Sequence, residues 1–285
     1  MLPTEEYIEQ AYFFRTLGER LKEREPIQVL LRQVKHELLA STKLPLAIDF
    51  LDTELRHSGT MAPAMRKLQH YFSPFQTFLV NEAEYERGRF DIQIAVKVLE
   101  NEADYRSKGI NPQGLFMYQF ETLCRNRLRY DRGLKAMSED PMFDANWQAW
   151  ILEVRHQVGL VELSNLIFLR SQEYVHRKSE AEGAPFVPQV PILFGEKEGR
   201  IAVANYQKDP LFLFSALQRH LGYPTVPRRE QADPTDELIP QLMRRMERLE
   251  VRLKIMEEES REGLDLTKFY VDPTKSEHQP GDNSF

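Results

Sequence analysis

The sequence predicts an all-α protein: a six-helix bundle, further helices packed on it, a proline-rich strap and a C-terminal coiled-coil helix. Apolar residues recur at spacings of three and four along most of the chain, which is the period of an amphipathic helix. Proline and glycine fall between these periodic segments and mark their ends. Hydrophobic residues make up 41% of the 285 residues and include 17 Phe and 11 Tyr, so an ordered core is expected over most of the chain.

The first two helices are predicted on either side of the Glu25–Pro26 break. Thr4 is the expected N-cap of the first, because Glu5 and Glu6 follow it in the first turn, where the helix dipole favours negative charge. Pro26 is expected to begin the second helix. The apolar faces consist of Tyr7, Ala11, Phe14, Leu17 and Leu21, and then of Ile27, Leu30, Leu31, Val34 and Leu38.

Four more helices complete the predicted bundle, residues 1–108. The third ends at Gly59, and residues 61–69 form a short fourth helix. Ser73–Pro74 has the composition of an N-cap and first helical position, so the fifth helix begins there. The sixth covers residues 92–105.

Residues 109–180 are predicted to form an additional helical subdomain, in which helical periodicity covers residues 115–137, 147–158 and about 161–177. These helices either extend the first bundle or form a second one. The next segment, residues 181–208, is predicted to be a proline-rich linker. Its three prolines favour an extended backbone and exclude a helix, so it is expected to lie across a surface as a strap. The residues available for this docking are Phe186, Val187, Ile192, Leu193 and Phe194, and the alternative is recognition of Pro185, Pro188 and Pro191 by another domain.

The C-terminal part contains a short apolar helix (209–224), a linker (225–235), a coiled-coil helix (236–262) and a polar tail expected to be disordered (263–285). Six apolar residues of the coiled-coil helix alternate at spacings of three and four: Ile239, Leu242, Met246, Leu249, Leu253 and Met256. Arg, Lys and Glu crowd the other positions. This a/d seam, called the seam below, favours association with itself or with a partner helix; the alternative is a helix packed on its own domain.

Several landmarks follow one another between about Ala11 and Tyr105. The segment AYFFRTLGERLKEREPIQVLL is predicted to contain an aromatic-rich helix, a turn with Glu25 before the proline, and a second helix. The segment LRHSGTMAPAM is predicted to contain a basic helix end, a glycine and a short helix, and Phe72-Ser73-Pro74 starts another helix. In this order the landmarks resemble the cytoplasmic domain of the type II secretion system F family, which is also found in type IV pilus platform proteins.

Two features depart from that family's pattern. Where the family often has Gly-Glu-x-Ser-Gly-x-hydrophobic, residues 83–90 are AEYERGRF, with Glu84 in place but one extra residue before Gly88. Family members continue into membrane-spanning helices, whereas here Gly109 leads into charged, amphipathic sequence. The resemblance implies a helical bundle with a binding role, associated with a secretion or pilus-type assembly machine, and not a platform in the membrane.

Composition points to a soluble cytoplasmic protein. The formal net charge of −6 argues against binding to a nucleic-acid backbone. The single cysteine, Cys124, excludes an intrachain disulfide, fits a reducing compartment and is expected to be a small buried hydrophobe. The N-terminal residues lack the features of a signal peptide, and the most apolar stretch, residues 160–169, is far shorter than the roughly 20 residues that span a bilayer.

Three Glu-x-x-His pairs support a rival enzyme hypothesis. Two such pairs with two further carboxylates build the di-metal sites of ferritin-like bundles. Solvated side chains near helix ends, where His suits the dipole, are the preferred interpretation. The pairs are Glu54/His57, Glu153/His156 and Glu173/His176.

Two charged clusters also have competing interpretations. The acidic group Glu82, Glu84, Glu86 and Asp91 is either a cation site or a solvated helix face. The basic run at residues 125–132 is typical of a nucleic-acid patch, but pairing of its arginines with carboxylates is preferred.

No Gly-rich phosphate loop, nucleophile elbow, HExxH or paired CxxC is present. We therefore predict a non-enzymatic cytoplasmic scaffold or adaptor, with no catalytic residue, cofactor or metal ligand. It binds a protein partner or itself through the bundle and the seam. The rival functions are a di-metal carboxylate enzyme and a nucleic-acid-associated adaptor.

Overall fold

The computed structural model describes residues 2–23, 25–85, 90–157, 159–228 and Met246. The chain divides into two units, residues 1–229 and residues 230–285. The predicted coiled-coil helix and tail belong to the second unit and, apart from Met246, lie outside the described residues. Within the described residues the regular elements are helices, with no strand, so the all-α prediction is confirmed. None of the described helices is long and apolar enough to cross a membrane.

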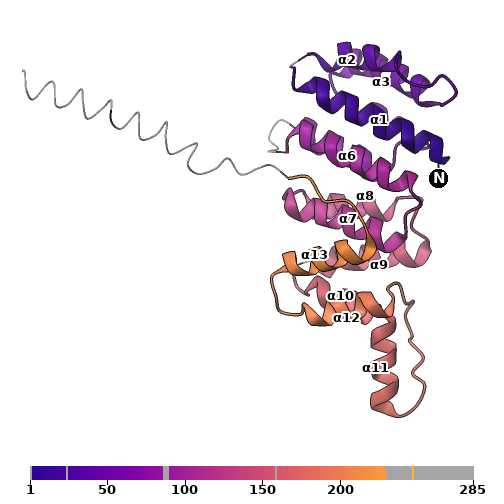
Figure 1. Cartoon of the computed structure of the whole chain (residues 1–285), viewed down its shortest axis with the longest axis vertical. Helices are drawn as coiled ribbons and strands as arrows, with labels where there is room; N and C mark the ends of the chain where they lie inside the picture. The colour runs from indigo at the N-terminus through magenta and orange to yellow at the C-terminus, as the bar shows by residue number, and fades with distance from the viewer. Residues whose placement is uncertain (1, 24, 86–89, 158, 229–245, 247–285) are drawn as a thin grey trace, which may run out of the picture. The chain divides into compact units, whose positions relative to one another are not determined.

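Thirteen helices make up the described part of the first unit, residues 2–228, which we call the helical body (Figure 1). They are α1 (Thr4–Leu21), α2 (Ile27–Lys35), α3 (Leu44–Ser58), α4 (Ala62–Lys67), α5 (Pro74–Glu84), α6 (Ile92–Ser107), α7 (Pro112–Arg125), α8 (Tyr130–Ser138), α9 (Ala145–Gln157), α10 (Leu163–Leu169), α11 (Gln172–Glu182), α12 (Glu196–Ala204) and α13 (Pro210–Leu221).

The helices of the body are stacked in layers. Helices α2 and α3 lie on one side of α1, and α6 lies on the other, followed by α7 and α8 (Figure 1). Beyond them α8 packs on α9 and α7 on α13, while α12 packs on both α10 and α13. One hydrophobic core continues through these layers, from Ala11 in α1 to Val226 beyond α13. The ranges predicted as a bundle (1–108) and an additional subdomain (109–180) are therefore parts of one compact unit.

Local sequence signals explain several helix ends. Ser73 caps α5 in a reciprocal capping box with Gln76, as its place before Pro74 predicts. Gly59, which follows α3, has a left-handed backbone with φ of 74°, a conformation that glycine adopts without steric cost. The prediction for Thr4 is wrong by one position, because Thr4 is the first helical residue of α1.

Two segments predicted as single helices are each broken in two. The helix predicted over residues 115–137 stops at Arg125 and restarts at Tyr130, with Arg127 in a left-handed conformation (φ 52°). The helix predicted over residues 161–177 is interrupted before Ser171, whose side chain caps α11 by accepting a hydrogen bond from the Tyr174 amide.

The predicted linker, residues 181–208, contains a helix that the proline pattern did not indicate. Residues 196–204 form α12, and the proline-containing part before it contacts α11, where the Phe186 amide donates a hydrogen bond to Ser179 Oγ at 2.9 Å. The Arg170 carbonyl accepts hydrogen bonds from the Leu193 and Phe194 amides, and the ring of Phe194 packs edge-on against two tryptophans. Docking of the strap is thus confirmed at Leu193 and Phe194, whereas Val187 is 80% exposed.

Candidate functional site

The seam residues predicted to bind a partner belong to the second unit. Five of them lie outside the described residues: Ile239, Leu242, Leu249, Leu253 and Met256. The sixth, Met246, is described, and its side chain is 60% exposed. The helical body contributes the segment that leads toward the seam, residues 222–228, which we call the exit segment.

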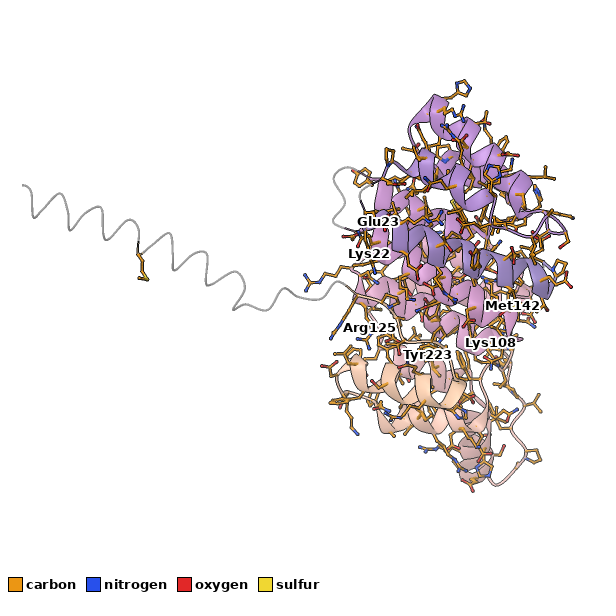
Figure 2. The ribbon with its side chains drawn as sticks, turned by 45° about the horizontal axis from the view of Figure 1, so that its top comes forward. Lys22, Glu23, Lys108, Arg125, Met142 and Tyr223 are labelled. Atoms are coloured by element: carbon orange, nitrogen blue, oxygen red, sulfur yellow. The ribbon has the colours of Figure 1, made fainter. Side chains whose placement is uncertain are left out.

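Tyr223 anchors the exit segment to the body. Its side chain is buried, and its hydroxyl donates a hydrogen bond to Glu121 Oε2 at 2.8 Å, with the Phe214 carbonyl oxygen at 3.0 Å as a second acceptor. Burial, together with the charge of Glu121, raises the pKa of Tyr223, so the hydroxyl stays protonated as a donor. Glu121 also pairs with Arg125, which is labelled near Tyr223 in Figure 2.

Side-chain amides hold the main chain of the exit segment at two further points. Asn101 Nδ2 in α6 donates to the Thr225 carbonyl at 3.2 Å, and Asn126 Nδ2 after α7 donates to the Pro227 carbonyl at 3.1 Å. Val226, between these two residues, is 4% exposed and belongs to the core. The exit segment is consequently fixed on α6 and α7 as far as Pro227.

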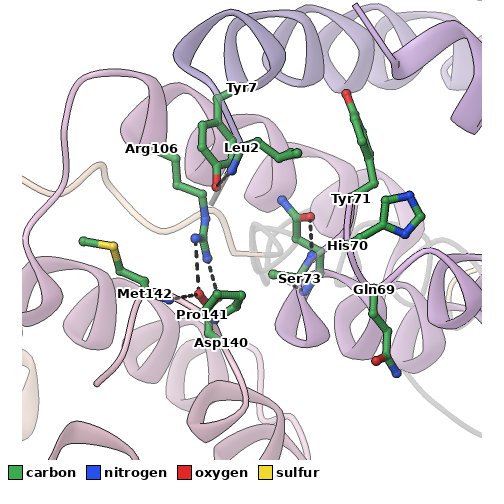
Figure 3. A pocket seen from close by; sticks show the side chains of 11 residues that line it. Leu2, Tyr7, Gln69, His70, Tyr71, Ser73, Arg106, Asp140, Pro141 and Met142 are labelled. Carbon is green, nitrogen blue, oxygen red and sulfur yellow. Dashed lines mark hydrogen bonds and ion pairs between the residues drawn. The ribbon is translucent and has the colours of Figure 1, made fainter. Parts of the chain in front are cut away.

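A pocket of about 290 Å³ lies in the helical body where α1, the α4–α5 connection, α6 and the α8–α9 turn meet (Figure 3). Its lining residues are Leu2, Tyr7, Gln69, His70, Tyr71, Ser73, Gln76, Arg106, Asp140, Pro141 and Met142. Tyr7 lies above Arg106 in Figure 3, with its ring centre 6.0 Å from the guanidinium carbon.

The charged wall of the pocket is a buried cluster, the Arg106 cluster, formed by Arg106 with Glu102 and Asp140. The two nitrogens at the end of the guanidinium bind the Asp140 carboxylate, and Nε donates to Glu102 Oε1 at 2.9 Å. The Met142 amide also donates to Asp140 Oδ1, at 3.0 Å. The side chains of Glu102 and Asp140 are fully buried, and that of Arg106 is 4% exposed.

Electrostatics assign this cluster a structural role. Burial would lower the pKa of Arg106, but the charges of Asp140 and Glu102 raise it above its ordinary value, so the guanidinium stays charged. Burial raises the pKa of Glu102; Arg106 opposes this shift and Asp140 adds to it. Two carboxylates share one cation, so the cluster favours no anionic ligand. It ties α6 to the α8–α9 turn.

The three Glu-x-x-His pairs are not brought together as metal ligands. Each carboxylate has a basic partner: Glu54 pairs with Lys67, Glu153 with Arg170, and Glu173 with Arg177 and Arg200. The histidines of the pairs, His57, His156 and His176, are exposed. The described residues include no group of three or more His, Cys, Asp or Glu side chains placed to hold a metal ion.

The acidic group also separates into individual contacts. Glu82 binds Arg129 through both oxygens, Glu84 accepts hydrogen bonds from the Met61 and Ala62 amides at the start of α4, and Asp91 caps α6. Glu86 lies outside the described residues. Burial raises the pKa of Glu84, and the two amides oppose that shift. Each of the three described carboxylates therefore has a different partner: a guanidinium, the amides at the start of α4, or the first turn of α6.

The basic run at residues 125–132 engages carboxylates of the body itself. Arg125 pairs with Glu121 and Arg129 with Glu82, as the preferred interpretation expected. Cys124, just before the run, is partly buried, and burial raises the pKa of its thiol to about 11. A thiol with so high a pKa is a poor nucleophile at neutral pH, in agreement with the prediction that it is a packing residue.

Sequence reasoning missed the anchors of the exit segment and the Arg106 cluster. Glu102 and Arg106 are spaced by four within a helix, a pattern that also describes exposed pairs such as Asp104 and Lys108. Asp140 stands before Pro141, a dipeptide that marks the end of a helix and does not indicate an ion pair. A more useful signal is that Glu102 and Arg106 lie on the same face as the apolar residues of their helix.

Comparison of the chain with protein-family models, with curated proteins and with solved structures finds no match in any of the three. The resemblance of residues 11–105 to the type II secretion system F family stays a prediction.

Proposed function

We propose that this chain is a non-catalytic helical adaptor, in which the helical body is joined to a partner protein through the seam. The observation that carries the proposal is the anchoring of the exit segment. Side chains of α6 and α7 bind its backbone at Thr225 and Pro227, and Tyr223 inserts into the core. The backbone is therefore held on the body as far as Pro227, before the linker residues that precede the predicted coiled-coil helix.

The composition of the seam supports a partner helix as its ligand. Burying one Leu or Met side chain stabilises by roughly 1.5–3 kcal/mol relative to leaving it in water. Six such apolar positions lie on one side of the predicted helix, while charged residues crowd the others. A second helix can cover such an a/d stripe, because each apolar side chain inserts between four side chains of the facing helix.

The resemblance of residues 11–105 suggests a setting for the adaptor, a secretion or pilus-type assembly machine. In support, residues 4–107 form a succession of helices, α1 to α6, as the resemblance implies. Affinity purification of the full chain from its source cells tests the setting. Recovery of unrelated proteins in place of assembly-machine proteins would remove the setting but leave the adaptor.

The adaptor proposal is tested by placing charges in the seam. Changing Leu249→Glu and Leu253→Glu together is expected to abolish association of the full chain, because two carboxylates would have to be buried against the partner helix. The melting temperature of the body is expected to stay unchanged, because these residues lie outside the first unit. Light scattering and thermal melting on the same sample give both results.

The matched control is the pair Val251→Glu and Ile255→Glu, which makes the same chemical change two residues further on, outside the a/d pattern. We expect this variant to associate as the unchanged chain does. Equal loss of association in both variants, or a lower melting temperature with the Leu249 and Leu253 changes alone, would contradict the proposal.

A further inference from the structure

We propose that the strap is a second binding surface of this chain, which presents an x-Pro-x-x-Pro motif to a partner domain with an aromatic-lined groove. The motif is Ala184-Pro185-Phe186-Val187-Pro188. All five residues belong to the described part of the helical body. This surface adds a contact to the one proposed for the seam and uses none of the seam residues.

Two prolines constrain the backbone of the motif to the polyproline II region. The ring of a proline holds φ at about −65°, and its clash with the preceding residue drives that residue into the β or polyproline II region. Pro185 and Pro188 thus constrain four of the five motif residues, themselves and the residue before each. In agreement, residues 185–188 belong to no helix or turn, and the chain bends after the motif, at residues 189–190.

The middle residue of the motif, Phe186, ties it to α11. Its amide donates a hydrogen bond to Ser179 Oγ at 2.9 Å, and its ring packs edge-on against the ring of Tyr174, with the ring centres 5.9 Å apart. Tyr174 packs edge-on in turn against Phe168 in α10. These contacts hold a short extended segment in place before any partner binds, which lowers the entropic cost of binding it.

The period of polyproline II turns the anchored residue away from a partner. This conformation has three residues per turn, so positions i and i+3 share one edge. Pro185 and Pro188 therefore form one edge. Ala184 and Val187 form a second, and Phe186 lies on the third, against α11. Exposure agrees with this arrangement, because Ala184 and Pro185 are exposed, Val187 is 80% exposed and Pro188 is partly buried.

The two edges that face away from α11 carry the chemistry that proline-recognition domains bind. Such domains accept PxxP segments in polyproline II conformation in grooves lined by aromatic side chains. Ala184-Pro185 and Val187-Pro188 offer two apolar x-Pro dipeptides, one turn apart. No described residue donates a hydrogen bond to the carbonyl oxygens of residues 184–188, so these acceptors are available to donors in such a groove.

The place of the motif in the fold gives a partner domain room to approach. Figure 1 shows α11 and the residues after it extending beyond α10 and α12, at the end of the helical body opposite α2 and α3. The motif lies on this projecting arm. A domain bound there would contact the outer edges of the strap without displacing a helix of the core.

Titration of the purified full chain with a panel of purified SH3, WW and EVH1 domains tests the partner, because these domains bind prolines through aromatic-lined grooves. At least one domain is expected to bind. Changing Pro185→Ala and Pro188→Ala together is expected to weaken that binding at least about tenfold. Val187→Asp alone is expected to do the same, since full burial of one Val side chain corresponds to a factor of roughly ten or more. Isothermal titration calorimetry measures both affinities.

The two variants separate lost contact from lost conformation, because Val187→Asp keeps both prolines. The matched control is Val190→Asp, which introduces the same charge at a side chain that is 42% exposed and lies beyond the motif. It is expected to bind within about twofold of the unchanged chain. Circular dichroism is expected to show the same melting temperature for all these chains, because Val187 and Val190 are exposed and the strap is outside the helices.

Three results would overturn the strap as a binding surface: no domain of the panel binds, the bound domain keeps its affinity for the Pro185 and Pro188 variant or for Val187→Asp, or Val190→Asp loses as much affinity as Val187→Asp. The seam variant with Leu249→Glu and Leu253→Glu is expected to bind the domain normally. The strap and the seam can therefore fail separately, since one is measured by domain binding and the other by association of the chain.

Discussion

Arg106 contacts two carboxylates that have no access to solvent, one in its own helix and one in the α8–α9 turn. Because desolvation of such groups is costly, removing the shared cation leaves two buried carboxylates without a compensating positive charge. The ion pair between Asp104 in α6 and Lys108, the C-cap of the same helix, has the same four-residue spacing, but its side chains are exposed, Lys108 at 69% and Asp104 at 44%. The two pairs on α6 therefore offer a matched comparison of buried and exposed charge.

We predict that Arg106→Met lowers the free energy of unfolding by about 3–5 kcal/mol at neutral pH. Lys108→Met is expected to change it by no more than about 0.5 kcal/mol, because an exposed pair is screened by water. Chemical denaturation followed by circular dichroism measures both.

The Arg106→Met deficit should also depend on pH. Burial already raises the pKa of Glu102, and loss of the guanidinium raises it further. Above the pKa of about 4.3 that Glu has when unfolded, the folded variant holds protons that the unfolded chain has released, so its stability falls as pH rises. The deficit relative to the unchanged chain is expected to be larger at about pH 7 than at about pH 5. A deficit independent of pH, or as small as that of Lys108→Met, would show that the cluster is not a buried charge tie.

Individual contacts of this kind are hard to predict from sequence. Glu82 and Glu84 are near neighbours in the chain, yet one binds Arg129 and the other holds the start of α4. Their spacing predicts the helix that carries them but not the distant groups that reach them. Those partners depend on how α4 and α8 pack against α5, which no local pattern records.

At the scale of elements, most helices could be predicted, because caps and apolar periodicity act locally. Helix α5 begins at Pro74 and α13 at Pro210, where Ser73 and Asp209 cap them. The helix breaks at Arg127 and before Ser171 could not be predicted, because long-range packing determines where they occur. Gly133 in α8 approaches Leu123 in α7 so closely that an added Cβ would lie 2.5 Å from its side chain, which a continuous helix does not permit.

Helix α12 was missed because the prolines before it dominated the interpretation of its segment. Its own signals are present: Glu196 and Glu198 lie in the first turn, and Ala202 faces the core. The charged start of a helix is thus a more reliable boundary here than the last proline of the strap.

The exit segment is the element on which the proposed function depends. We predict that Tyr223→Phe lowers the stability of the body by about 1–2 kcal/mol, because Glu121 loses a buried hydrogen-bond donor. Amide hydrogen exchange in residues 222–228 is expected to accelerate in the variant. The control is Tyr206→Phe, a change at a side chain that is 50% exposed. Unchanged exchange in the exit segment of Tyr223→Phe would show that Asn101 and Asn126 hold it without the tyrosine.

At the scale of the whole molecule, the first unit has one continuous core that includes residues on both sides of Gly109. Composition and periodicity predicted its helical class but placed a domain boundary at residue 108. Sequence patterns mark where helices stop, and they do not show whether the next helix covers the same core. The Arg106 cluster crosses that boundary, since Asp140 belongs to the region predicted as an additional helical subdomain.

The division of labour between the two units is tested most directly by the molar mass and melting of a chain that ends at Arg229, compared with the full chain. We predict that the shortened chain is monomeric and melts cooperatively at the temperature of the body in the full chain, because its core and the exit-segment anchors all lie within residues 1–229. The full chain is expected to associate. A shortened chain that still associates, or that loses its cooperative transition, would contradict the assignment of association to the seam and of folding to the helical body.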